Sequence, residues 1–164
     1  MYEDTNFTVS LPTSAAWDRT LGWFVNTGRK SVFEIAGEST SWGNYVNSQY
    51  TLTTGGYQFN NEYIDITEIS PLVKAKGEKK KLETGSSDLF CVNNIFDLAG
   101  NVAEWVLSNS NDDVYGICRG GYYGNSLSWV PIDTQASVDD EKQTISYNGG
   151  YFGGDVGFRA AIFL

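Results

Sequence analysis

Only one stretch of this sequence, residues 11–28, carries a sustained helical pattern, so the rest must fold from shorter pieces. The apolar residues that share one face of this expected helix are Trp17, Leu21, Phe24 and Val25. Thr13 or Ser14 can cap its start, and Gly28 can end it. A shorter helical turn is expected at residues 31–36.

Aromatic residues and glycine dominate the rest of the chain. The 164 residues include five Trp, ten Tyr, nine Phe and eighteen Gly, but three Pro. Large rings bury much area at low entropic cost, and glycines permit tight turns and close backbone approaches. This composition predicts one loop-rich α+β domain spanning residues 1–164, rather than a helical bundle or a disordered chain.

Strand patterns in this sequence are short and separated by polar, glycine-rich segments. The expected strands are residues 63–69, 102–107, 116–122 and 156–164. Residues 41–57 are expected to form an irregular loop, and residues 74–87 an exposed one. A turn with unusual backbone angles is expected at Gly100, before Asn101. Gly120 and Gly121 indicate a bulge or the close approach of another backbone, and Cys118 is expected to be buried.

The charge of the chain argues against polyanionic partners. Its net charge is −9, so a nucleic acid or an anionic membrane would be repelled. The basic run Lys79, Lys80 and Lys81 lies between acidic residues and is expected to be a solvated loop tip. No apolar stretch approaches the length of a membrane span, so membrane insertion is not expected. The first residues are not a signal peptide and are typical of a domain cut from a longer chain.

The chain has no histidine and two cysteines, Cys91 and Cys118. The lack of histidine removes the commonest general base, the Ser-His and Cys-His nucleophile systems, and histidine-based metal sites. The cysteines are not in a CxxC arrangement, and both a disulfide and two free thiols remain open.

Three ordered segments resemble the formylglycine-generating enzymes and their sulfatase-modifying-factor relatives. Residues 11–18, Leu-Pro-Thr-Ser-Ala-Ala-Trp-Asp, resemble that family's Leu-Pro-Thr-Glu-Ala-Glu-Trp-Glu. Residues 94–106, Asn-Ile-Phe-Asp-Leu-Ala-Gly-Asn-Val-Ala-Glu-Trp-Val, resemble its Asn-x-x-x-Asp-Met-x-Gly-Asn-Val-Trp-Glu-Trp. Residues 119–121 and 157–159 are similar to its Arg-Gly-Gly-Ser and Gly-Phe-Arg strands, and residues 42–44 to a Trp-Gly-Asn loop. The resemblance implies an irregular C-type-lectin-like fold with one N-terminal helix and short antiparallel strands.

The chemistry of that family does not carry over to this chain. Its enzymes oxidise a substrate cysteine with a copper-binding cysteine pair that follows Arg-Gly-Gly-Ser, whereas residues 122–133 here contain no cysteine. Serine, asparagine and tyrosine have neither the softness nor the charge of thiolates. A related branch uses histidine-bound iron, which this chain cannot bind in that way. The sequence therefore favours a module without catalysis, and no copper is expected.

The resemblance also implies a structural calcium ion, which that family holds near its Trp-Gly-Asn and Gly-Asn-Val-x-Glu segments. The matching residues, with Tyr45 and Val102 contributing carbonyls, are Asn44, Tyr45, Asn101, Val102 and Glu104. Calcium takes six to eight oxygen ligands, and these residue types supply oxygens. The alternative is that Glu104 pairs with Arg119 or Arg159 and that Asn101 forms an Asx turn.

Two segments near the C-terminus have the composition of adaptable recognition surfaces, in which Tyr and Trp give rigid contact area and Ser, Gly and Asn give hydrogen bonds. The residues predicted to form a ligand-binding surface are Tyr122, Tyr123, Asn125, Ser126, Ser128, Trp129, Tyr147, Asn148, Tyr151, Phe152 and Asp155. Variable proteins of diversity-generating retroelements share the lectin-type fold and display diversified residues near a C-terminal end that this chain resembles. The alternative is a glycine-rich loop with buried aromatics.

Three functions are compatible with these observations. The leading hypothesis is a ligand-binding or display module of a phage-tail or cell-surface protein, found on a virion or cell surface, with an unknown protein or glycan as its ligand. The first alternative is an oxidase of the formylglycine-generating type, which would need Cys91 and Cys118 together at an accessible cleft. The second is a scaffold domain within a larger assembly.

Overall fold

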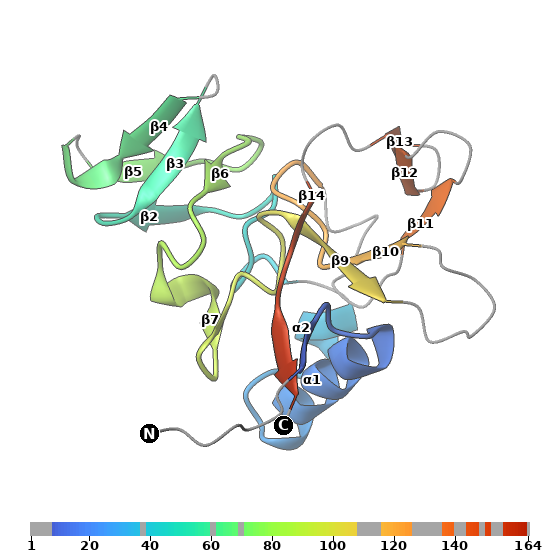
Figure 1. The fold of residues 1–164 in the computed structure, drawn as a ribbon. Helices are drawn as coiled ribbons and strands as arrows, with labels where there is room; N and C mark the ends of the chain where they lie inside the picture. Colours follow the sequence, from blue (N-terminus) through green and yellow to red (C-terminus); the bar gives the residue numbers. More distant parts are fainter. Residues whose placement is uncertain are drawn as a thin grey trace, which may run out of the picture.

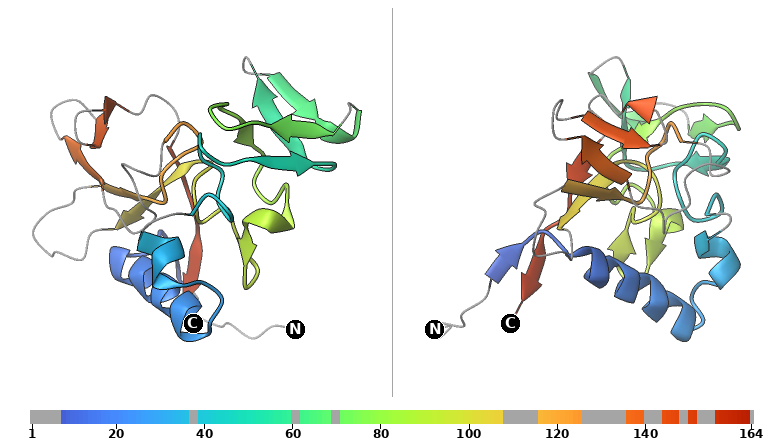
Figure 2. Two further views of the ribbon diagram at one scale, coloured as in Figure 1. Left: turned by 180° about the vertical axis from the view of Figure 1, so that it is seen from behind. Right: turned by 90° about the vertical axis from the view of Figure 1, so that its right-hand side faces the viewer.

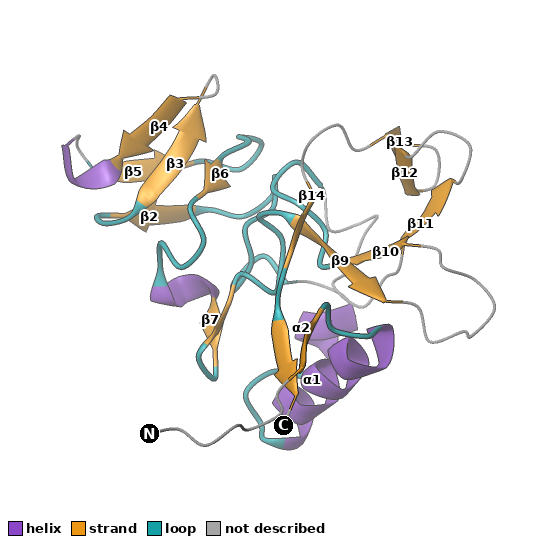
Figure 3. Ribbon diagram, viewed as in Figure 1, coloured by secondary structure: helices purple, strands orange, loops and turns teal. Residues whose placement is uncertain are grey.

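The computed structural model has the expected α+β composition, with short helices near the start of the chain and many short strands after them. It describes residues 8–36, 39–59, 62–68, 71–107, 116–125, 136–139, 144–147, 150–151 and 156–163. Helices α1 and α2 lie at the base of the molecule, with strands β2–β6 above them on one side and β9–β13 on the other (Figure 1). Figure 2 shows the same division from behind, and Figure 3 shows how much of the chain between the strands is loop.

Helix α1 (Ser14–Asn26) confirms the one long pattern in the sequence. Thr13 is its cap, because its side-chain oxygen accepts a hydrogen bond from the Ala16 N–H at 3.1 Å. Gly28 follows the helix with a φ of +69°, a backbone conformation that favours glycine and ends helices. Helix α2 (Val32–Ala36) confirms the expected shorter turn.

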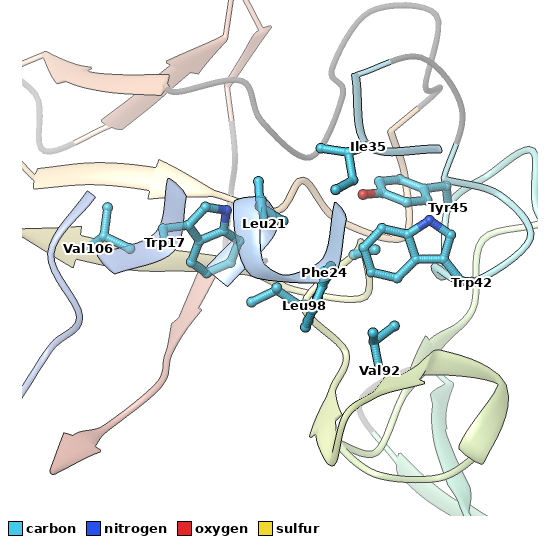
Figure 4. Packing of buried hydrophobic residues seen from close by; sticks show 10 residues of the cluster. Trp17, Leu21, Phe24, Ile35, Trp42, Tyr45, Val92, Leu98 and Val106 are labelled. Atoms are coloured by element: carbon cyan, nitrogen blue, oxygen red, sulfur yellow. The ribbon is translucent and has the colours of Figure 1, made fainter. Parts of the chain in front are cut away.

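The apolar face of α1 is buried in a cluster that we call the helix-side core. Its buried members are Trp17, Leu21, Phe24, Ile35, Trp42, Tyr45, Val92, Leu98, Ala99 and Val106. Figure 4 shows these side chains gathered between α1, the loop that contains Trp42, and strand β9. Phe24 and Trp42 meet edge to face, with 6.3 Å between ring centroids. The helix-side core therefore joins the N-terminal helices to segments far along the chain.

The largest sheet among the described residues has the strand order β13-β12-β11-β10-β9-β14. In sequence order its strands are β9 (Ala103–Leu107), β10 (Gly116–Arg119), β11 (Ala136–Asp139), β12 (Thr144–Tyr147), β13 (Gly150–Tyr151) and β14 (Val156–Phe158). Neighbouring strands are antiparallel, apart from β14, which runs parallel to β9. β15 (Ala161–Phe163) pairs instead with β1 (Thr8–Ser10), so the first and last described strands lie side by side.

The second group of strands surrounds a separate cluster, the strand-side core. It is formed by Tyr50, Leu52, Ile66, Leu72, Leu82 and Phe90. The strands here are β2 (Tyr50–Leu52) paired with β5 (Leu72–Lys74), and β3 (Gly56–Phe59) paired with both β4 (Glu62–Asp65) and β6 (Lys81–Leu82). A small hairpin of β7 (Cys91–Val92) and β8 (Ile95–Phe96) follows.

Several predicted boundaries of strands and loops are wrong. The expected irregular loop at residues 41–57 contains β2 and the start of β3, and the expected exposed loop at residues 74–87 contains β6. The expected strand at residues 63–69 ends at Asp65 and continues as a 3₁₀ turn. The expected strand at residues 156–164 is two strands with different partners. Strands of two to four residues contain too few alternations to be recognised from hydrophobicity alone.

Candidate functional site

The residues singled out by the sequence meet where the loop around Asn44 crosses the turn at residues 99–101. The Asn44 N–H donates to the Ala99 carbonyl at 3.1 Å, and the Asn101 N–H donates to the Asn44 carbonyl at 2.8 Å. Gly100 lies between them with a φ of +73°, and a Cβ there would be 2.3 Å from the Asn44 oxygen. This crossing therefore requires glycine at position 100, as the sequence predicted from the turn.

The side chains of Asn44 and Asn101 form a buried amide network at this crossing. Asn44 Nδ2 donates to the Lys80 carbonyl at 2.7 Å and to Asn101 Oδ1 at 3.1 Å, while Asn44 Oδ1 accepts from the Tyr50 hydroxyl at 2.9 Å. Asn101 Oδ1 also accepts from the Leu82 N–H at 2.8 Å, and its Nδ2 donates to the Leu82 carbonyl at 3.0 Å. We call these two residues the amide base, because they connect both cores.

Lys74 holds the carbonyls next to the amide base. Its ammonium, on a side chain that is 1% exposed, donates to the Tyr45 carbonyl at 2.8 Å and the Ser48 carbonyl at 2.7 Å. Burial lowers the pKa of Lys74 to about 8, although the charge of Glu78 acts in the opposite direction. The Tyr45 hydroxyl donates to the Gly120 carbonyl at 2.7 Å, which ties the same loop to the end of β10.

Glu104 forms a bidentate ion pair with Arg159. Arg159 Nε donates to Glu104 Oε2 at 2.8 Å and Nη2 donates to Oε1 at 2.7 Å, while Nη2 also reaches the Phe96 carbonyl at 2.8 Å. Burial raises the pKa of Glu104, and the bonds from Arg159 partly offset that rise. The alternative partner for Glu104, Arg119, pairs with Asp18 instead.

Most of the predicted calcium ligands are engaged by other groups of the protein. The oxygens of Asn44, Asn101 and Tyr45 already accept hydrogen bonds from the protein, and both Glu104 oxygens bind Arg159. Calcium would need six to eight free oxygens. Within the described ranges, no group of three or more His, Cys, Asp or Glu residues could hold a metal ion. Calcium binding stays a prediction, and the contacts give these residues a role in joining the fold.

Arg119 connects the large sheet to the first helix. Its side chain is fully buried, donates to Ser14 Oγ at 3.0 Å, and forms an ion pair with Asp18. Its guanidinium also lies over the Trp17 ring, 5.9 Å from the centroid. The motif at residues 11–18 and the motif at residues 119–121 are therefore in direct contact, although they lie far apart in the sequence.

The first residues of the predicted ligand-binding surface form a turn that is fixed to the amide base. The Tyr123 N–H donates to the Asn101 carbonyl at 3.1 Å, and the Val46 N–H donates to the Asn125 carbonyl at 3.0 Å. Asn125 Oδ1 accepts from the Tyr122 N–H at 2.9 Å, and the Tyr122 and Tyr123 rings meet edge to face at 5.5 Å. All three residues are half-buried, so the turn presents polar and aromatic groups from a fixed backbone.

Two glycines place this turn directly after β10. Gly120 and Gly121 have φ values of +90° and +71°, and a Cβ on Gly120 would be 2.9 Å from the Leu98 carbonyl. The predicted close approach of another backbone is therefore confirmed. Of the other predicted surface residues, Tyr147 is on β12 and Tyr151 on β13, in a hairpin two strands away from β10. The remaining ones, Ser126, Ser128, Trp129, Asn148, Phe152 and Asp155, lie outside the described residues.

The two cysteines lie in different parts of the fold and are not joined by a disulfide. Cys118 is buried in β10, as predicted, and burial raises its pKa to about 12. A thiol with that pKa is protonated at neutral pH and is a poor nucleophile and metal ligand. Cys91 is half-buried in the β7–β8 hairpin. An oxidase of the formylglycine-generating type would need both thiols at an accessible cleft, and the buried Cys118 does not meet this requirement.

Sequence reasoning missed Lys74 and Tyr50, which support the amide base. The alternation Leu72-Val73-Lys74 places Lys74 on the same face of β5 as the buried Leu72, with Val73 exposed between them. That alternation was present in the sequence, but a lysine on an apolar face is uncommon and the strand has only three residues.

Comparisons with known proteins give one distant neighbour. No protein-family model and no curated protein matches the chain. Among solved structures, it is similar to Treponema denticola variable protein 1, with 17% sequence identity over 93% of this chain and a TM-score of 0.48. The match covers 46% of that protein, so this chain spans about half its length. A likeness this distant assigns neither a fold nor a function. In the described part of the chain, no helix has the length and apolar character needed to cross a membrane.

Proposed function

We propose that the chain is a ligand-binding or display module without catalytic activity, in a C-type-lectin-like fold. Its contact surface is formed by the turn at residues 122–125, the segment that follows it, and the region of β12, β13 and the residues up to β14. The observation that carries this proposal is the attachment of the turn to Asn101 of the buried amide base and to Val46. A surface fixed in this way can vary its outward side chains without altering the hydrogen bonds beneath them.

The composition of the surface supports the same function. Tyr, Trp, Ser, Asn and Gly together supply rigid contact area and adaptable hydrogen bonding at a protein or glycan interface. The chain has a net charge of −9, which favours a ligand other than a nucleic acid. Presentation on a virion or cell surface, as part of a longer protein, is the setting that such a module would suit.

The experiment compares the wild-type chain with the triple variant Tyr123→Ala, Trp129→Ala and Tyr151→Ala on an array of glycans and extracellular proteins. We expect the wild type to bind at least one array member and the triple variant to lose that binding at least tenfold, with little change in the unfolding midpoint. The control is Phe33→Ala, because Phe33 on α2 is 69% exposed and lies far in sequence from the proposed contact surface. Binding of every array member by the triple variant as tightly as by the wild type would contradict the proposal.

A further inference from the structure

A recess of about 250 Å³ lies on the small sheet of β3, β4 and β6. This sheet is on the side of the molecule opposite β11–β13, so the recess is separate from the proposed contact surface (Figure 1). The residues that line it come from all three strands and the chain just after β6: Tyr57, Gln58, Tyr63, Lys81, Leu82 and Glu83.

Strand register brings the polar residues of the recess into one row. Gln58 on β3 is directly opposite Tyr63 on β4 and Lys81 on β6. Residues directly opposite each other in a sheet project to the same face, so these three side chains share a face. Glu83, two residues after Lys81, extends that row at its end.

Tyr63 is held in place as the aromatic floor of the recess. A Cβ at Gly56 would be 2.2 Å from Tyr63 Cε2, so the glycine is what allows the ring to lie over the strand. The Tyr63 hydroxyl donates to Glu83 Oε2 at 3.1 Å, which fixes the outer end of the ring. The side chain is nevertheless 60% exposed, so a face of a positioned ring is open to a ligand.

The neighbouring aromatic rings are engaged by a cation, whereas Tyr63 is not. Lys80 Nζ lies 5.3 Å from the Tyr57 ring centroid and 5.7 Å from that of Phe59. Among the described residues no cation lies over Tyr63. Tyr63 is therefore the ring of this sheet that is available for stacking.

The hydrogen-bonding groups of the recess select for an uncharged ligand with hydroxyl groups. Lys81 only donates, the Glu83 carboxylate only accepts, and the Gln58 amide does both. The recess carries one positive and one negative group, so neither an anion nor a cation gains a net attraction from the pair. A hydroxyl can accept from Lys81 and donate to Glu83, and the C–H face of a sugar ring can pack on an aromatic ring.

We propose that this recess binds one pyranose ring of a neutral saccharide, stacked on Tyr63 and hydrogen-bonded by Gln58, Lys81 and Glu83. The volume of the recess admits one ring, so specificity resides in a single sugar unit of a longer chain. This site is additional to the proposed contact surface at residues 122–155 and uses none of its residues.

The test titrates the full chain with oligomers of glucose, galactose, mannose and N-acetylglucosamine, followed by two-dimensional NMR of ¹⁵N-labelled protein. We expect at least one neutral oligomer to shift amides within residues 56–64 and 81–83. Oligomers of glucuronic acid and of glucosamine serve as the anionic and cationic comparators, and we expect each to bind at least tenfold more weakly. Binding that is equal for charged and neutral oligomers, or absent for every neutral one, would overturn the proposal.

Variants of the recess test whether saccharide binding depends on the Tyr63 ring. We expect Tyr63→Ala to weaken the affinity at least tenfold, Tyr63→Phe to keep most of it because the ring remains, and Phe33→Ala to have no effect. Should Tyr63→Ala not fold, Lys81→Met and Glu83→Gln test the hydrogen bonds without removing the ring, and each is expected to weaken binding severalfold. Retained affinity in all of the recess variants would refute the assignment. The triple variant of the contact surface should bind these oligomers normally, which separates this proposal from the proposed function.

Discussion

A buried basic side chain lies beside each of the two cores of this fold, and its charge is compensated differently in the two places. In the helix-side core, Arg119 faces the carboxylate of Asp18 and the hydroxyl of Ser14. In the strand-side region, Lys74 binds the carbonyls of Tyr45 and Ser48, and no acid of the described residues forms an ion pair with it. Carbonyl dipoles offset desolvation less completely than a carboxylate does, which agrees with the lowered pKa of Lys74. The stability of the strand-side region should therefore change with pH in the alkaline range.

The largest expected effect is at Gly100, where the two cores are joined. Gly100→Ala places a Cβ 2.3 Å from the Asn44 carbonyl oxygen and forces a side chain into a positive φ, so we expect a loss of at least about 3 kcal/mol. Gly22→Ala is the matched control, because nothing lies within 4 Å of its added Cβ in α1. That control should stabilise the protein by up to about 1 kcal/mol. Urea unfolding of both variants measures the contrast, and similar losses would show that the crossing is not tightly packed.

Removing the acid near each buried cation tests how the charges of Arg119 and Lys74 are compensated. Asp18→Ala leaves the buried Arg119 guanidinium without a carboxylate, and we expect a loss of about 2 to 3 kcal/mol. Glu78→Ala, which removes an exposed acid near Lys74, should cost at most about 1 kcal/mol. Chemical denaturation at pH 7 gives both values. A cost for Glu78→Ala as large as that for Asp18→Ala would mean that Lys74 depends on an acid after all.

The pH dependence of stability should distinguish the two regions. The pKa of Lys74 is about 8 in the folded protein and 10.5 as its ordinary value, so between these values the unfolded chain binds more protons than the folded one. The Lys74 contribution to the free energy of unfolding therefore rises with pH across that window, by at most about 1.4 kcal/mol per pH unit. The measurement is the difference in unfolding free energy between wild type and Lys74→Met at pH 7 to 10. A difference that stays constant would contradict the lowered pKa.

Removing a cap should cost more stability at helix α1 than at the short 3₁₀ turn that begins after Ser87. Thr13→Ala removes the acceptor for the Ala16 N–H at the start of a helix of 13 residues, and we expect a loss of about 1 kcal/mol. Ser87 accepts from the Leu89 N–H before a three-residue 3₁₀ turn, and Ser87→Ala should cost less. Thermal unfolding of the two variants gives the order, and a larger loss at Ser87 would reverse it.

The same two regions differ in how well the sequence predicts them. Helix α1 was predicted with its end and with Thr13 as one of two candidate caps, because its apolar residues repeat over more than two turns. The turn at Gly100 was also predicted, because a glycine before Asn101 indicates unusual backbone angles. The strands around Lys74 were not predicted, since each has two to four residues and the lysine interrupts the apolar pattern.

The site was predicted in part. The sequence brought Asn44, Asn101 and Glu104 together through a family resemblance, and the structure does place the two asparagines in contact. It could not show that Glu104 binds Arg159, because the two residues are 55 positions apart and Arg119 was an equal candidate. The recess around Tyr63 was not foreseen either, since it arises from the pairing of three strands that the sequence did not specify.

In the proposed function, a fixed amide base supports a surface whose side chains are free to vary. A saturation library at the predicted surface residues and at Asn44, Gly100 and Asn101, displayed on yeast and sorted for protease-resistant chains, tests it directly. We expect most substitutions at the surface residues to leave the chain folded, and very few to do so at the three positions of the crossing. Surface residues that tolerate no more substitutions than Asn44, Gly100 and Asn101 would contradict a display module built on this base.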